Sequence, residues 1–326
     1  MTLTAPAPVL APPASPTTPS PAPWVVLALC LLVAAVRLRD DALLQTWSTV
    51  ALAVVLQALP FLVLGTLLSG AVAAYVPAGM IPRLVPRRPV LAVPMAGVLG
   101  LALPGCECSS VPLAGRLVSA GAPPAAAFTF LLAAPAINPV VVVATAVAFP
   151  GQPQVPAARV LASLVAAIVV GLVWTRYGGR LARCDVHEHS HDGPRLMALR
   201  SALVEDFAAS AGWLVLGGAT AATLQTLVPR DLLDTVAGSA VGAVAVLAVL
   251  AVLLAVCSEA DAFVAAGLTQ FSLTSRLVFL TVGPMVDVKL VALQLGTFGR
   301  GFVLRFAPLA FCAAVLSAVL VGSVLL

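Results

Sequence analysis

Apolar residues along this chain fall into long stretches that are separated by short polar segments. A helix that crosses the roughly 30 Å hydrocarbon core of a bilayer needs about 20 mostly apolar residues. The stretches lie near residues 23–36, 47–75, 90–104, 124–149, 157–174, 202–228, 236–256, 276–295 and 302–325. The pattern predicts an all-α polytopic membrane protein with about nine long spans plus two short, broken segments at 105–122 and 257–272.

The composition supports this prediction. Of the 326 residues, 61% are hydrophobic and 9% are charged, whereas a soluble domain has about 25% charged residues. The net charge of +4 comes from arginines spread over many short loops, which is typical of orientation signals rather than of a nucleic-acid-binding surface. We expect a multi-pass protein of the cell inner (plasma) membrane, with the lipid bilayer as a partner, no nucleic acid and no cofactor.

The two halves of the chain resemble each other in sequence. Cys108 and Cys257 are 149 positions apart, and so are Asn138 and Asp287. The same or nearly the same offset relates Pro135 to Pro284, Pro77 to Pro229, and residues 61–65 to 213–217. Such internal repeats are typical of secondary transporters. The predicted divisions are a disordered Pro-rich tail (1–23), a first span plus repeat 1 (24–175), a cytoplasmic linker (176–200) and repeat 2 (201–326).

The repeats can be parallel or inverted, depending on whether the two short segments re-enter on one side or cross the bilayer once. With the Arg-rich central loop inside, the parallel arrangement leaves seven arginines outside. The inverted arrangement leaves five there, namely Arg37, Arg39, Arg159, Arg230 and Arg276. Because short loops rich in arginine favour the cytoplasm, we favour inverted repeats, in which each short segment crosses with the help of an unwound stretch.

Residues 104–112 read Pro-Gly-Cys-Glu-Cys-Ser-Ser-Val-Pro and interrupt an apolar run. Proline removes a backbone donor and clashes with the preceding turn, so we expect unwound backbone throughout this segment. Within a membrane, such backbone is tolerated only where it is packed in protein or lines a cavity. Cys106, Glu107 and Cys108 would then face that cavity. The alternative is that the two cysteines pack as small hydrophobic residues.

Residues 257–261 read Cys-Ser-Glu-Ala-Asp and follow a long apolar run. Ionisable residues inside a span indicate a functional site. Cys257 is therefore a candidate substrate ligand, and Glu259 and Asp261 are candidates for carrying a coupling proton. The alternative is that the helix ends at Cys257 and that the two acids sit in headgroup water.

Two further elements break apolar spans near their middle, at 134–139 and 283–289. A broken helix exposes free amides and carbonyls that can hold ions or solutes at the midplane. Asn138 and Asp287 lie at matching places in these two breaks. On a regular helix Asp287 and Lys289 would point apart, so a pair between them requires irregular backbone or further partners. The alternative is a proline kink that is capped by the Asn or Asp.

A polar loop between the halves carries three alternating histidines and a cysteine. On an extended chain the histidines would share one face, and this set of ligands could bind a transition metal. The predicted metal-binding residues are Cys184, His187, His189 and His191. The alternative is a hydrated linker.

These motifs resemble those of the predicted permease family that includes the ArsP and YraQ proteins. The resemblance covers roughly residues 47–310. It rests on Cys-Glu-Cys-Ser-Ser-Val-Pro at 106–112, Pro-Ala-Ile-Asn-Pro at 135–139, Cys-Ser-Glu-Ala-Asp-Ala-Phe at 257–263 and Gly-Pro-Met-Val-Asp-Val-Lys at 283–289. The resemblance implies an efflux permease, and in members that export trivalent arsenic compounds paired cysteines hold the arsenic. The family pattern Cys-Ser-Cys-Gly reads Cys-Glu-Cys-Ser here, and the extra acid suggests a site that tolerates a cation.

The sequence therefore predicts a membrane permease, not an enzyme, that exports a soft metal or metalloid species such as trivalent arsenicals by alternating access at a midplane site. The predicted substrate-binding residues are Cys106, Cys108, Cys257, Asn138 and Asp287. The residues predicted to couple transport to a proton or ion are Glu107, Glu259, Asp261 and Lys289. The alternatives are a membrane thiol–disulfide relay through Cys106 and Cys108, and a non-transporting subunit that works with a membrane partner.

Overall fold

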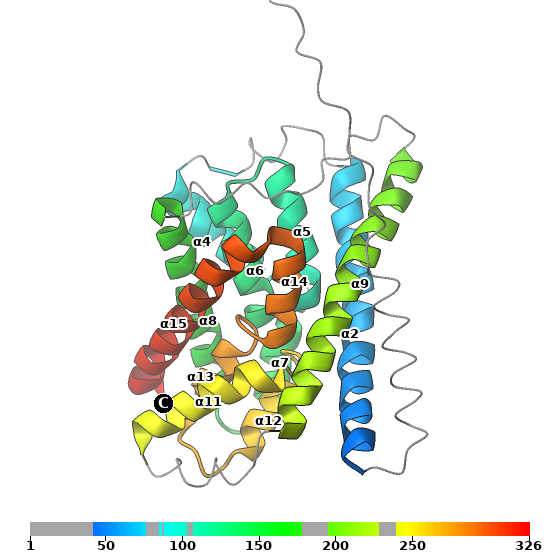
Figure 1. The fold of residues 1–326 in the computed structure, drawn as a ribbon. Coiled ribbons are helices and arrows are strands. Elements are labelled where there is room, and N and C mark those ends of the chain that lie inside the picture. Colours follow the sequence, from blue (N-terminus) through cyan, green and yellow to red (C-terminus); the bar gives the residue numbers. More distant parts are fainter. Residues whose placement is uncertain (1–41, 76–84, 87, 103–106, 178–194, 228–238) are drawn as a thin grey trace, which may run out of the picture.

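The computed structural model describes residues 42–75, 85–86, 88–102, 107–177, 195–227 and 239–326. Within these ranges every regular element is a helix (Figure 1), as the apolar pattern predicts. The predicted tail and the predicted first span, at 23–36, lie outside the described residues.

The helices follow one another in two similar series. The first series is α2 (Ala42–Tyr75), α4 (Pro89–Leu99), α5 (Glu107–Ser119), α6 (Pro124–Ile137), α7 (Pro139–Ala148) and α8 (Gln154–Tyr177). The second is α9 (Arg195–Leu227), α11 (Ala240–Leu254), α12 (Asp261–Gly267), α13 (Leu273–Val282), α14 (Val288–Phe298) and α15 (Arg300–Leu325). Helix α9 begins inside the stretch 176–200 that the sequence assigns to the linker.

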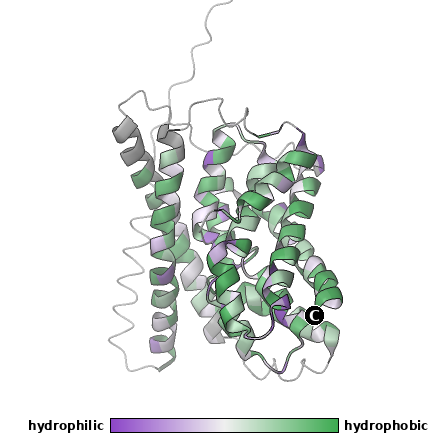
Figure 2. Cartoon of the chain, turned by 180° about the vertical axis from the view of Figure 1, so that it is seen from behind, coloured by the Kyte–Doolittle hydropathy of each residue, from purple (hydrophilic) through white to green (hydrophobic). Residues whose placement is uncertain are grey.

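Several of these helices have the length and composition of membrane spans. Four stretches of the described chain are long and apolar enough to cross a bilayer, namely Ala42–Ala71, Pro124–Ala148, Gln154–Arg176 and Arg300–Leu325. The ribbon is coloured mostly as apolar, with few hydrophilic positions (Figure 2). Large apolar side chains such as Leu304 and Val324 are exposed on the outside, which suits contact with lipid rather than with water.

The packing of the first series recurs in the second. Helix α6 packs against α4 and α8, and helix α13 packs against α11 and α15. Several contacts cross between the series, among them those of α2 with α9 and of α8 with α15. Two others join motif segments, because α5 packs against α14 and α12 packs against α7. In Figure 1 the first of these pairs lies in the upper half of the bundle and the second lies in the lower half. The long helices α2 and α9 run side by side along the bundle.

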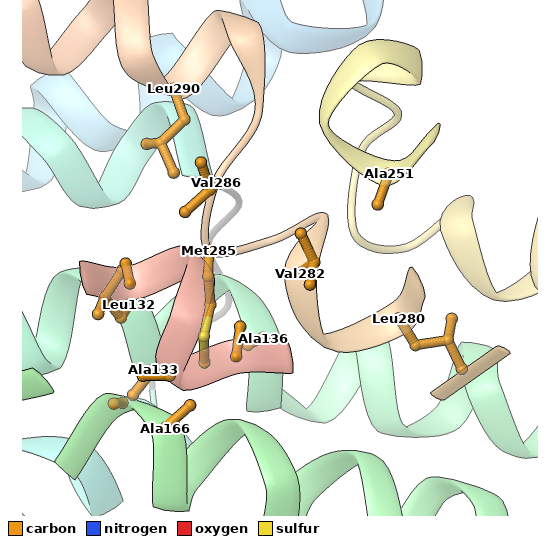
Figure 3. Packing of buried hydrophobic residues seen from close by; sticks show 14 of the residues in the cluster. Leu132, Ala133, Ala136, Ala166, Ala251, Leu280, Val282, Met285, Val286 and Leu290 are labelled. Carbon is orange, nitrogen blue, oxygen red and sulfur yellow. The ribbon is translucent and has the colours of Figure 1, made fainter. Parts of the chain in front are cut away.

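The core between the series is made of small and aromatic side chains. Close to the break between α13 and α14, Met285 packs among Leu132, Ala133, Ala136 and Ala166 (Figure 3). Small residues of this kind let transmembrane helices approach closely. A second part of the same core is aromatic, with ring centroids 4.6 to 5.6 Å apart, and comprises Phe128, Trp174, Phe298, Phe302 and Phe306.

Two glycines at matching positions let the long helices α2 and α9 pack closely against the motif segments. Gly65 of α2 lies directly against the backbone of Ser109 in α5. A Cβ added at Gly217 of α9 would lie 2.9 Å from Cα of Lys289 in α14. Any side chain at either position would therefore push a long helix away from a segment that carries candidate site residues.

The backbone of the first cysteine segment corrects one prediction. The segment 104–112 was expected to be unwound, yet α5 is helical from Glu107 and includes Pro112. Pro112 lies beyond the first turn of α5 and removes one backbone bond there, but neighbouring helices can satisfy the freed group in a membrane. Residues 103–106, including Cys106, lie outside the described residues.

Candidate functional site

Two helix breaks lie at the places that the sequence predicts. Helix α6 ends at Ile137, and the side chain of Asn138 accepts a hydrogen bond of 2.9 Å from the amide of Val141 in α7. The break between α13 and α14 is capped in the same way, because Asp287 Oδ1 accepts a bond of 2.6 Å from the amide of Leu290. Both breaks are confirmed, and both polar residues act as N-caps, as the alternative interpretation proposed.

The acid of the first cysteine segment meets the only lysine of the chain. Glu107, in the first turn of α5, accepts a hydrogen bond of 2.9 Å from Lys289 Nζ, in the first turn of α14. Both side chains are at most 1% exposed. The contact joins one half of the chain to the other inside the apolar core. It also leaves Glu107 with a matching cation, so the extra acid of the first motif is not a free negative charge.

Asp287 completes this ion-paired group. Its Oδ2 lies 3.8 Å from Lys289 Nζ, and its backbone is extended, with φ −135° and ψ 169°. Asp287 therefore lies before the helix while Lys289 lies within it, which lets two side chains only two positions apart face each other. A lysine at a helix N-terminus opposes the helix dipole, and the two carboxylates offset that cost.

Two described cysteines adjoin the same group. Cys257 Sγ lies 3.9 Å from Lys289 Nζ and the residue is 2% exposed. Cys108 is fully buried and directly follows Glu107. Both thiols are free, and both point into the protein rather than toward lipid.

A second buried ion pair involves an arginine that the sequence analysis counted on the outer side of the membrane. Arg159 lies in α8 and is fully buried. It donates to Asp261 Oδ2 at 2.8 Å, to Thr145 Oγ1 at 2.9 Å and to the carbonyl of Ser258 at 3.1 Å. Asp261 is therefore ion-paired inside the protein and not in headgroup water. Arg159 was missed because it lies close to the start of an apolar run. The rule that a charge within a span indicates function would have found it.

The buried carboxylates are only partly satisfied. Among the described residues, Glu107 Oε2, Glu259 Oε2, Asp261 Oδ1 and Asp287 Oδ2 are buried without a hydrogen-bond partner. Among the described residues, Lys289 pairs with Glu107 and Asp287, and Arg159 pairs with Asp261. Unpartnered buried oxygens of this kind mark places for protons, water or a ligand.

Comparison with known proteins identifies the family. The sequence model of the predicted permeases of the ArsP type matches residues 43–323. The chain belongs to this family. It is 32% identical to the UPF0718 protein YcgR of Bacillus subtilis over 264 residues, which are 78% of this chain and 90% of that protein. It is 28% identical over 280 residues to a Streptococcus mutans protein, provisionally named as a subunit of a two-component membrane permease complex; the match covers 83% of this chain and 93% of that protein. No solved structure gives a significant match.

Membership in this family, together with the apolar helices, makes the chain a multi-pass membrane permease of the plasma membrane. A permease moves a solute across the membrane, so family membership indicates a transporter. The matched range includes both cysteine segments and both helix breaks.

The structure bears on the predicted metal ligands only in part. Cys184, His187, His189 and His191 lie outside the described residues, so metal binding by the central loop stays a prediction. Within the described ranges, no group of three or more His, Cys, Asp or Glu side chains has an arrangement that could hold a metal ion.

Proposed function

We propose that this permease exports a soft metalloid or metal species, such as a trivalent arsenical, by alternating access at a site near the midplane. The observation that carries the proposal is the contact of Glu107 with Lys289, beside Cys257. It brings the interrupted segments of the two halves together in the buried core. Cys106, Cys108 and Cys257 would offer sulfur to the substrate, and Asn138 and Asp287 would complete the site.

Alternating access would follow from two inverted repeats, one before and one after the central linker. Three features support this arrangement: the nearly constant sequence offset, the recurring helix packing, and the contacts of α5 with α14 and of α7 with α12 in opposite halves of the bundle. Related transporters of this design rock one repeat against the other around a fixed central site. The two helix breaks would lie at that site.

The charges near the thiols favour a neutral substrate over a metal cation. The ammonium of Lys289 already lies against Glu107 and Asp287, so a cation entering between the carboxylates would have to displace it. A trivalent arsenical carries hydroxyl or organic groups and no charge, and soft thiols bind such a centre well. The unpartnered oxygens of Glu107, Glu259 and Asp261 would carry the coupling proton, and Lys289 would stabilise its release.

A sensitivity panel tests this function. Cells lacking the gene would be complemented with the wild type, Cys108→Ser, Cys257→Ser or Cys312→Ser, and grown on trivalent arsenicals and on copper and zinc salts. Cys312 is exposed, so its variant is the matched control and should protect as well as the wild type. The proposal expects Cys108→Ser and Cys257→Ser to lose protection against one class of compound. Equal growth of all strains on every compound would exclude the soft-ligand site.

A second candidate is a subunit that works with a membrane partner, because one relative is provisionally named as a subunit of a two-component permease complex. Purified chain in proteoliposomes separates the two. A self-sufficient permease moves its substrate alone, whereas a subunit does so only after its partner is added.

A further inference from the structure

Two buried ion pairs tie the halves of the chain together. Glu107–Lys289 joins α5 of the first series to α14 of the second. Arg159–Asp261 joins α8 of the first series to α12 of the second, and the exposed fraction of each side chain is at most 2%. The first pair belongs to the candidate substrate site. The second involves an arginine that lies outside every motif described above.

Each pair lies at one of the two cross contacts that join motif segments of the two series. Glu107–Lys289 sits where α5 meets α14, in the upper half of Figure 1. Arg159 acts where α12 meets α7, in the lower half, because it also holds Thr145 of α7 and the carbonyl of Ser258 just before α12. The guanidinium of Arg159 therefore binds α7, α12 and the segment just before α12 on that side of the bundle.

Stability alone does not account for the second pair. A buried ion pair loses hydration that its attraction barely repays, and apolar residues of similar volume serve a fixed interface at least as well. The pair is also incompletely bonded, since Arg159 Nε and Asp261 Oδ1 have no hydrogen-bond partner. The hydroxyls of Ser163 and Ser258 nearby are buried without a partner as well. Such a contact can exchange for water, as an interface that opens and closes requires.

We propose that Arg159 is a positioning residue for transport, which closes the α7–α12 side of the bundle over the Cys257 segment through its pair with Asp261. The Glu107–Lys289 pair closes the α5–α14 side, and transport breaks the two pairs in turn. The structure, in which both pairs are formed, is then the state closed on both sides. This proposal rests on the alternating access proposed above.

The test measures how fast Cys257 reacts with a membrane-impermeant maleimide from each side. Right-side-out and inside-out vesicles would carry the full chain with its other five cysteines replaced by serine. Arg159→Gln should raise labelling at least tenfold from one side only, and Lys289→Met should raise it from the opposite side. Arg305→Gln, which changes an exposed arginine of α15, is the matched control and should leave labelling low from both sides.

Reversal of the pair separates gating from a general loss of structure. Arg159→Asp combined with Asp261→Arg should return labelling close to the starting level, which a merely loosened protein would not do. If Arg159→Gln does not reach the membrane, Arg159→Lys is measured in its place and should give a smaller rise from the same side. Unchanged labelling, or an equal rise from both sides, would overturn the proposal. Labelling needs no substrate. If the sensitivity panel shows no difference between strains, the proposed substrate is excluded, but the labelling result still stands.

Discussion

The two cysteine segments occupy matching places in the two halves, but they fold differently. Cys108 lies in the first turn of α5 and belongs to the main buried hydrophobic cluster. Cys257 lies in an irregular stretch between α11 and α12, and its sulfur faces the ammonium of Lys289. A helix therefore holds the first thiol, whereas the second lies on irregular backbone beside the ammonium of Lys289.

The charges around the two segments differ as well. The position that matches Glu107 in the second half is Val256, and the position that matches Asp261 in the first half is Pro112. Each segment is nevertheless held by a buried ion pair to the other half. The comparison teaches that two similar helical series can place charge at equivalent interfaces while using different positions to do so.

The largest effect is expected from the loss of Lys289, which pairs with Glu107, because the second cysteine segment has no acid at the matching position. Lys289→Met leaves Glu107 buried without its cation, and breaking a buried ion pair costs about 3–5 kcal/mol. Thermal unfolding of the purified protein in detergent should show a large loss of stability. Adding Glu107→Gln to this variant removes the uncompensated charge and should restore most of the lost stability. Equal stability of the wild type and Lys289→Met would mean that the pair does not hold the first segment.

Alanine substitutions at the two glycines where α2 and α9 approach the motif helices test whether both motif helices are equally tightly packed. Gly65→Ala and Gly217→Ala each place a methyl group against the backbone of a motif helix, and overpacking costs about 1–3 kcal/mol. Gly267→Ala is the matched control, because a Cβ there meets nothing within 4 Å. The unfolding midpoint in detergent should be lower for both variants than for the wild type, and equal or slightly higher for the control. If all three alanine variants unfold alike, the close approach is not a constraint.

The caps of the two helix breaks should have smaller and nearly equal effects. Replacing an N-cap with alanine costs about 1 kcal/mol, so Asn138→Ala and Asp287→Ala should lower the unfolding midpoint by similar amounts. Asp287→Asn keeps the cap and removes the charge that faces Lys289. If Asp287→Asn is as unstable as Asp287→Ala, then the ion pair with Lys289, and not the cap, stabilises the break in the second half.

The smallest expected difference is in the reactivity of the two thiols. Cys257 should react with N-ethylmaleimide several-fold faster than Cys108 in the folded protein, because a helix and an apolar cluster enclose Cys108. Mass spectrometry of peptides after timed labelling measures both rates in one sample, and the denatured protein serves as control. Faster reaction at Cys108 would reverse the comparison drawn above.

Local features of the fold could be predicted from the sequence. Long apolar runs indicated the helices, and the proline and asparagine or aspartate pattern indicated breaks at Asn138 and Asp287, because capping involves neighbours only three positions away. The same local reasoning was wrong at Pro112, which lies inside α5, because neighbouring helices in a membrane can satisfy the backbone group that a proline frees.

Long-range contacts could not be predicted in this way. Glu107 and Lys289 were both recognised as candidates, but nothing local indicates that they pair across 182 positions. Arg159 was counted on the outer side of the membrane, because hydropathy does not give the depth of a residue near the start of a span. Its burial depends on Thr145 and Asp261, which lie on other helices.

Binding of phenylarsine oxide to the purified protein tests the central claim most directly, since this reagent bridges two thiols. Intact-mass measurement would count the arsenic bound per chain in the wild type, Cys108→Ser and Cys257→Ser. If the two segments share one internal site, the wild type binds one arsenic tightly and both variants lose it. Full binding by Cys257→Ser would contradict the account, because the first segment would then bind arsenic without the second.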